Sequence, residues 1–303
     1  MDTKFSKPKT FGEILDHTFS LSKNRFKDFF MILLILMGPI YLLQAIIQLL
    51  SGVSFFRELG NGEIWFEQIL SSFDETAVPL DSSIGADIAL ILTGLFGIVL
   101  FPVAEAAVLF AINHIRKNEE YTVGSVIKEA FSRFWPILGS TILFGLIIFG
   151  LIIIPILMIS FTGVFGAIIH PAIGIIFAIV LFLGFAVGIG YLLTRWSFYF
   201  GSVVLDRESP GFTRSWRLTK KRTWLLMGLY IIFYIIIATI SSAIELTFGI
   251  FLGNSVLLSI IVNLATILTT MLLTVGYAVM YLDLKTRHDA DDIKDMIEDY
   301  KSY

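Results

Sequence analysis

Long apolar stretches separated by short polar segments run along most of the chain. The longest covers residues 134–194, which contain no Asp, Glu, Lys or Arg and only one histidine, His170. A helix needs about 20 apolar residues to cross a bilayer core, so this stretch is too long for one crossing and fits two. The residue before a proline avoids helical backbone angles. His170-Pro171 therefore predicts a turn between two membrane spans.

The same pattern predicts six spans in a single membrane domain covering 1–303. We expect an all-α polytopic membrane protein, with six transmembrane helices arranged as three hairpins. An acidic loop outside the cytoplasm, 51–86, and a charged cytosolic tail, 283–303, complete the chain. The predicted spans are 29–50, 88–112, 137–160, 171–193, 224–247 and 256–282.

A short amphipathic segment precedes each predicted hairpin. These segments start at Thr10, Thr122 and Ser209, and apolar residues recur in them at steps of three and four, which is typical of one helix face. Thr10 with Glu13 fits a capping box, and Ser209-Pro210 fits a cap followed by a first-turn proline. We predict three interfacial helices on the cytosolic side and a three-fold parallel repeat; a chance likeness among surface helices is the alternative.

The positions of the cations predict the orientation of the spans. Of the 22 Lys and Arg residues, all except Arg57 lie in four segments: 1–28, 113–136, 194–223 and 283–303. Because cytoplasmic loops of membrane proteins are rich in Lys and Arg, both termini are expected in the cytosol. We expect this basic face to contact anionic lipid headgroups of the bilayer rather than nucleic acid.

Composition and motifs argue against common enzyme classes. The chain has no cysteine, which excludes disulfides and thiolate chemistry. The sequence lacks both the H-E-x-x-H zinc motif and the phosphate-binding G-x-x-x-x-G-K-[ST] motif. The carboxylates of loop 51–86 lack a compact ligand spacing. We therefore expect no enzyme activity, no metal site and no cofactor.

Polar side chains inside the predicted spans are the candidate functional residues. A carboxylate within a span is costly and usually faces a partner or water, so we predict that Glu105 pairs with Arg195. The alternatives are that Glu105 reaches the cytosolic interface alone or is protonated. Four further residues could line a polar cavity, because amides and hydroxyls avoid hydrocarbon. They are Gln44, Gln48, Asn263 and Thr270.

Two glycines predict close helix packing. Gly184 and Gly188 form a small-x-x-x-small step on the fourth predicted span. Such steps let two helix backbones approach closely within a membrane. We expect a neighbouring helix to cross at this face.

Three short segments of the sequence form a recognisable set. They are Lys9-Thr10-Phe11-Gly12-Glu13-Ile14-Leu15-Asp16, Arg195-Trp196-Ser197-Phe198 through Ser215-Trp216-Arg217-Leu218-Thr219-Lys220, and Tyr281-Leu282-Asp283-Leu284-Lys285-Thr286-Arg287. Together they resemble the bacterial integral-membrane family named for the membrane domain of glycerophosphoryl diester phosphodiesterases. The resemblance covers nearly the whole chain and implies a multi-pass protein of a bacterial plasma membrane, without the catalytic barrel of those enzymes.

These observations favour a non-enzymatic multi-pass membrane protein that acts as a scaffold, a sensor or a protective membrane component. A transporter or permease for a small or amphiphilic molecule is the alternative, and it requires the polar span residues to share one cavity. An intramembrane enzyme acting on lipid phosphates is a third possibility.

Overall fold

The computed structural model describes residues 5, 7–57 and 84–301. This part of the chain is all-helical and contains no strand. Most of the predicted acidic loop lies outside the described residues. The helices are α1 (Phe11–Asn24), α2 (Phe26–Leu50), α4 (Ile84–Lys117), α5 (Val123–Ser132), α6 (Phe134–Ile169), α7 (Pro171–Ser197), α8 (Tyr199–Leu205), α9 (Phe212–Leu218), α10 (Thr223–Leu252) and α11 (Val256–Lys301).

Six of these helices are long and apolar enough to cross a membrane, and they fit a multi-pass membrane protein. They correspond to the six predicted spans, with longer bounds. The turn predicted at His170 is confirmed, because His170 ends α6 and its Nδ1 accepts a hydrogen bond from the Ala172 N–H that starts α7 (3.3 Å). α11 is 46 residues long and continues from the last predicted span into the predicted C-terminal tail, as far as Lys301.

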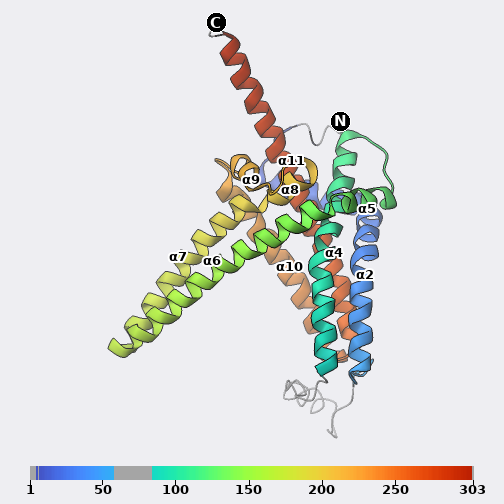
Figure 1. Cartoon of the computed structure of the whole chain (residues 1–303), viewed down its shortest axis with the longest axis vertical. Helices are drawn as coiled ribbons and strands as arrows, with labels where there is room; N and C mark the ends of the chain where they lie inside the picture. Colours follow the sequence, from blue (N-terminus) through green and yellow to red (C-terminus); the bar gives the residue numbers. More distant parts are fainter. Residues whose placement is uncertain (1–4, 6, 58–83, 302–303) are drawn as a thin grey trace.

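Four long helices form a bundle with α11 at its centre (Figure 1). α11 contacts α10, α2 and α4, and α2 lies along α4. The α11 side chains Val275 and Val279 are fully buried, as are Phe29 of α2 and Leu109 of α4. Burial of such side chains is the main packing contribution between the helices. The bundle therefore holds the best-packed part of the molecule.

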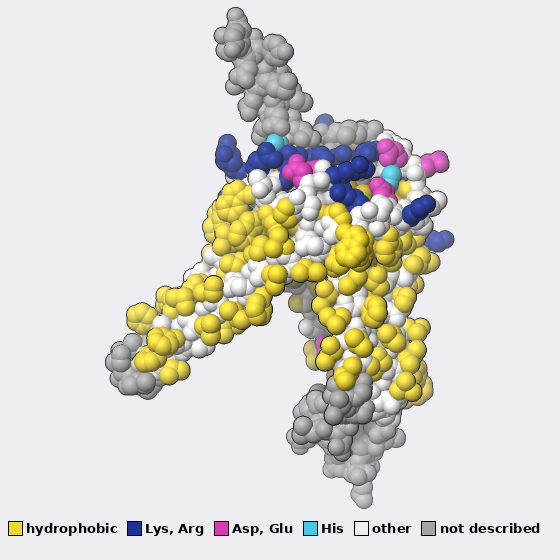
Figure 2. Space-filling view, in the orientation of Figure 1, with side chains coloured by type: hydrophobic (Ala, Val, Ile, Leu, Met, Phe, Trp, Pro, Cys, Tyr) yellow, Lys and Arg dark blue, Asp and Glu magenta, His cyan; other side chains and the backbone are white. Residues whose placement is uncertain are grey.

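The remaining pair of long helices, α6 and α7, diverges from the bundle as an arm (Figure 1). The two helices pack along each other, and they contact the rest of the chain through residues near the start of α6 and the end of α7, such as Thr141, which accepts from the Tyr199 hydroxyl, and Tyr191, which packs against Trp224. Most of the arm surface is apolar and exposed (Figure 2). In the most apolar part of α6 only 6% of residues are buried, and in α7 none are, so this surface needs lipid or another protein to cover it.

Of the three predicted short helices, two start at the predicted residues, Thr10 and Thr122, with side-chain caps. The Thr10 N–H and hydroxyl both donate to Glu13 Oε2 (2.6 and 2.8 Å), and Thr122 Oγ1 accepts from the Ser125 N–H (3.1 Å). The prediction for Ser209 is wrong, because α9 is capped by Gly211. Gly211 has φ +79°, and a Cβ there would lie 2.5 Å from the Tyr199 carbonyl oxygen. Only glycine fits this turn.

The predicted glycine packing on α7 is also wrong. A Cβ at Gly184 or Gly188 would meet nothing within 4 Å. The close approach occurs instead beside the α6–α7 turn, where a Cβ on Gly166 would lie 2.6 Å from Gly174 Cα. The sequence pattern identified small residues but not which helix faces meet.

Cations gather at one end of the molecule (Figure 2). We call it the basic end; the short helices α1, α5, α8 and α9 lie there, where α11 leaves the bundle (Figure 1). At the opposite end, Arg57 donates to the Ile250 carbonyl near the end of α10 (2.7 Å). This asymmetry follows the uneven distribution of Lys and Arg along the sequence.

Candidate functional site

The structure does not bring Glu105 and Arg195 together. The Arg195 guanidinium lies over the Trp216 ring, 3.7 Å from its centroid, and donates to the Trp216 carbonyl oxygen (2.9 Å). Its backbone oxygen accepts from the Ser215 hydroxyl (2.7 Å). The predicted pair is therefore replaced by a contact between the end of α7, which carries Arg195, and α9, which carries Trp216.

Glu105 instead faces a cavity of about 240 Å³, which we call the Glu105 cavity. Six helices line it: α4, α6, α8, α10 and α11, and α7 through its last residue, Ser197. It lies where the arm meets the bundle. Glu105 is the only charged side chain among the described residues that line it, and it makes no hydrogen bond or ion pair within the described part of the chain.

Hydroxyl groups around the cavity are already hydrogen-bonded to one another. Tyr230 donates to the Ser197 hydroxyl (3.0 Å), and Tyr277 donates to the Ser197 carbonyl (3.2 Å) while accepting from the Gly201 N–H (2.7 Å). These bonds join α7, α8, α10 and α11. They fix the tyrosines in place and leave the Glu105 carboxylate as the one charged acceptor that lacks a partner among the described lining residues.

Aromatic rings make up much of the cavity wall. Phe144 of α6 packs against Tyr199 of α8, with ring centroids 4.6 Å apart. Phe200, Tyr230, Tyr234 and Tyr277 also line the cavity. Tyr234 is 60% exposed, so the wall at α10 is open to the surroundings of the bundle.

The four residues predicted to share a cavity with Glu105 do not line it. Asn263 donates to Gln44 Oε1 at 3.5 Å, which joins α11 to α2 within the bundle. The Gln48 Oε1 atom is buried and has no hydrogen-bond partner among the described residues. Thr270 lies one turn before Thr274, which does line the cavity. The threonine pattern on α11 thus pointed to the correct helix, while the glutamines belong to a separate contact.

A buried charged cluster at the basic end was missed from the sequence. Asp206, at the end of α8, accepts from the Tyr281 hydroxyl (2.7 Å) and from Arg214 Nε (3.3 Å), and Lys285 Nζ bonds its other oxygen. We call Asp206, Arg214, Tyr281 and Lys285 the Asp206 cluster. Burial raises the pKa of Asp206. The hydrogen bonds from Lys285 and Tyr281 and the charges of Lys285 and Arg214 lower it by more than burial raises it, so the pKa lies below its ordinary value. The sequence signal that could have located this cluster is the acidic residue Asp206 inside the basic stretch 195–222.

The N-terminal segment is attached to α11 by a second charged contact. The Lys9 N–H donates to Asp283 Oδ1 (2.6 Å), and Arg287 bridges Asp283 Oδ2 (2.8 Å) and the Lys9 carbonyl (2.7 Å). Beside this contact, Ile14 and Leu21 of α1 are buried in the hydrophobic core. The apolar face of α1 is thus turned at least partly toward the protein.

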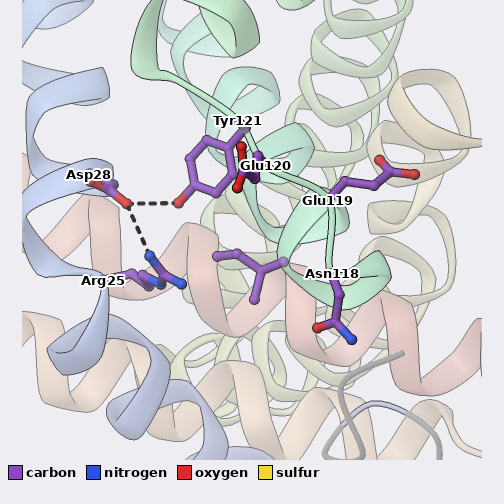
Figure 3. Close-up of a pocket in the computed structure, with 7 residues that line it drawn as sticks. Arg25, Asp28, Asn118, Glu119, Glu120 and Tyr121 are labelled. Atoms are coloured by element: carbon purple, nitrogen blue, oxygen red, sulfur yellow. Dashed lines mark hydrogen bonds and ion pairs between the residues drawn. The ribbon is translucent and has the colours of Figure 1, made fainter.

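A larger and more polar pocket, about 510 Å³, opens at the basic end (Figure 3). Tyr121, from the α4–α5 connection, donates to Asp28 Oδ2 of α2 (2.9 Å), and Arg25 lies 3.8 Å from the same oxygen. Burial, together with the hydrogen bond to Asp28, raises the pKa of Tyr121 above its ordinary value. Of the labelled groups, Tyr121, Asp28 and Arg25 bond one another, so these three hold the α4–α5 connection against the start of α2 (Figure 3).

His114 makes a similar structural contact beside this pocket. Its Nδ1 lies 2.7 Å from Glu119 Oε2 and its Nε2 lies 3.1 Å from Glu129 Oε2, which connects α4 to α5. Within the described ranges, no group of three or more His, Asp or Glu side chains is placed to hold a metal ion.

No protein-family model, curated protein or solved structure matches this chain.

Proposed function

We propose that the chain is a non-enzymatic protein of a bacterial plasma membrane that spans the bilayer six times, as three hairpins, with both termini in the cytosol. In this arrangement the basic end faces the cytosol, as the distribution of Lys and Arg requires. α1, α5 and α9 then lie at the cytosolic interface, each just before a hairpin. Their cations would contact anionic headgroups.

Of the scaffold, sensor and protective roles, the scaffold role has the best support. The observation that carries it is the exposed apolar surface of the α6–α7 arm, which the chain itself leaves uncovered. A pair of helices with no bundle around it offers one membrane partner two long faces without disturbing the packed core.

The family resemblance belongs to the same proposal. Its residues occur in the structural contacts of the basic end: Arg195 with Trp216, Tyr281 and Lys285 with Asp206, and Asp283 with Arg287. These short segments therefore support a shared way of closing the cytosolic end of the helices. They do not carry catalytic groups of the phosphodiesterase kind.

Photocrosslinking tests the scaffold role. A photoreactive residue at Phe149 or Phe182, which are 62% and 61% exposed on the arm, should give a discrete protein adduct in living cells. The same residue at Ile91 of α4, 64% exposed, is the matched control on the bundle. Lipid adducts alone at all three positions would contradict the scaffold role.

A transporter or permease is the second candidate, and the Glu105 cavity is the observation that favours it. A carboxylate in a span facing a cavity is typical of substrate pathways. The separation of Gln44 and Asn263 from this cavity removes part of the polar path that the transporter hypothesis needed.

A further inference from the structure

We propose that the Glu105 cavity binds an amphiphile whose head is an organic ammonium ion and whose hydrocarbon tail lies between the arm and the bundle. This inference rests on the membrane placement proposed above, but it is independent of whether the protein acts as a scaffold or as a transporter.

Glu105 has no oppositely charged partner among the described residues that line the cavity. A carboxylate taken out of water and left without a partner is costly, and a positive charge nearby offsets that cost. No Lys, Arg or His is among the described residues that line the cavity, so the chain does not supply that charge there. A cation brought by a ligand would.

Aromatic rings form the cavity wall beside Glu105. Phe144, Tyr199, Tyr230 and Tyr234 surround the space that Glu105 faces. Aromatic rings attract organic ammonium ions, and rings combined with a carboxylate favour these ions over small inorganic cations, which prefer several oxygen ligands. Because the nearby hydroxyls of Tyr230 and Tyr277 already have partners, they offer few free ligands to a metal ion.

The space between the arm and the bundle gives room for the hydrocarbon tail of the amphiphile. The cavity lies where α6 leaves the bundle, and the molecule is hollowed between the arm and the bundle (Figure 2). Exposed apolar side chains border this hollow (Figure 2). A tail could lie there while the head reaches Glu105. A phosphate next to the ammonium group would find no cation in the cavity, so a zwitterionic phospholipid fits less well.

Equilibrium binding to the full chain in nanodiscs tests the proposal. Radiolabelled dodecyltrimethylammonium should bind saturably, above its partition into empty discs. Glu105→Gln should weaken this binding about tenfold or more, since it removes the charge and keeps the shape. Glu245→Gln, at an exposed carboxylate of α10 that is not among the lining residues, is the matched control and should bind as the wild type does.

Competing amphiphiles with the same tail test the head. Dodecyl maltoside and dodecylphosphocholine should compete about tenfold less well than unlabelled dodecyltrimethylammonium. Equal competition by either one, non-saturable binding, or unchanged binding by Glu105→Gln would each overturn the proposal.

Tyr234→Leu decides the matter if Glu105→Gln does not fold. Tyr234 is exposed, so its replacement leaves the packing intact, and loss of one ring should weaken binding about two- to fivefold. Unchanged binding by Tyr234→Leu would overturn the proposal. Failure of the membrane placement would appear separately, as reversed labelling of cysteines at the two ends of the molecule.

Discussion

Asp206 shows how much one side chain contributes to the basic end. It joins α8 to α11 through Tyr281 and Lys285 and reaches toward α9 through Arg214, and its side chain is only 7% exposed. Removing one partner of a buried charge cluster leaves the other charges uncompensated, which costs several kcal/mol.

Asp206→Asn should therefore lower the free energy of unfolding by about 3 kcal/mol at neutral pH. Thermal unfolding in detergent measures this, and Glu208→Gln, an exposed carboxylate two residues later, should have almost no effect.

The stability that Asp206 contributes should depend on pH. Because the folded-state pKa of Asp206 is below its unfolded value of about 3.9, the contribution is present above that pH and is lost as pH falls through the folded pKa. The gap between wild type and Asp206→Asn should narrow as the pH falls below the unfolded pKa of about 3.9; a gap that stays constant on acidification would contradict the assignment.

Gly201 is required for the close packing of α8 on α11. A Cβ at this position would lie 2.5 Å from the Tyr281 ring, which is fully buried. Gly201→Ala should destabilise the protein by about 1–3 kcal/mol through overpacking. Gly188→Ala places a Cβ in open space on a helix and should be neutral or slightly stabilising. Comparable losses in the two variants, measured by thermal unfolding, would show that the α8–α11 contact is not what limits position 201.

The Arg195 side chain interacts with the Trp216 ring and not with Glu105. A double-mutant cycle of Arg195→Leu with Trp216→Leu should give a coupling of about 0.5–1 kcal/mol, as expected for a cation over an aromatic ring. The cycle of Arg195→Leu with Glu105→Gln should be additive within about 0.5 kcal/mol. Coupling in the second cycle alone would restore the ion pair expected from the sequence.

At the scale of elements, the helices were predictable and their mutual placement was not. Hydrophobic length alone located the six long helices, and local capping located α1 and α5 through Thr10 and Thr122. These signals depend on neighbouring residues. The partners of Arg195 and Asp206 and the residues that surround Glu105 lie on other helices, and no local pattern encodes which helices meet.

The start of α9 illustrates the same limit. Ser209-Pro210 carries the composition of a helix cap, but the close approach of Tyr199 and Gly211 places the start two residues later. Tertiary contacts, and not the local capping preference of Ser209-Pro210, therefore determine where α9 begins.

The attachment of α1 to α11 is an element-scale contact that can be tested directly. Asp283→Ala removes the acceptor of both the Lys9 N–H and Arg287 Nε, so α1 should detach while the long helices persist. Hydrogen exchange in residues 9–21 should accelerate about tenfold or more, which corresponds to a loss of about 1.4 kcal/mol or more in local stability. Asp16→Ala, an exposed carboxylate on α1 itself, is the control and should leave exchange unchanged. Equal protection in Asp283→Ala would mean that the apolar face of α1 holds it alone.

At the scale of the whole molecule, two features organise the account. A bundle around α11 carries the charged contacts of one end, and an apolar arm projects from it. The Glu105 cavity lies at the point where the two parts meet. In the proposed membrane role the arm and the long helices lie in the bilayer, and the distribution of Lys and Arg turns the basic end toward the cytosol.

Single-cysteine labelling tests this orientation most directly, because the chain has no cysteine of its own. Asn254→Cys, in the exposed α10–α11 turn, should react with an impermeant maleimide in intact cells. Lys220→Cys, exposed at the basic end, should react only after the cells are permeabilised. Labelling of Lys220→Cys in intact cells, with Asn254→Cys protected, would contradict the account.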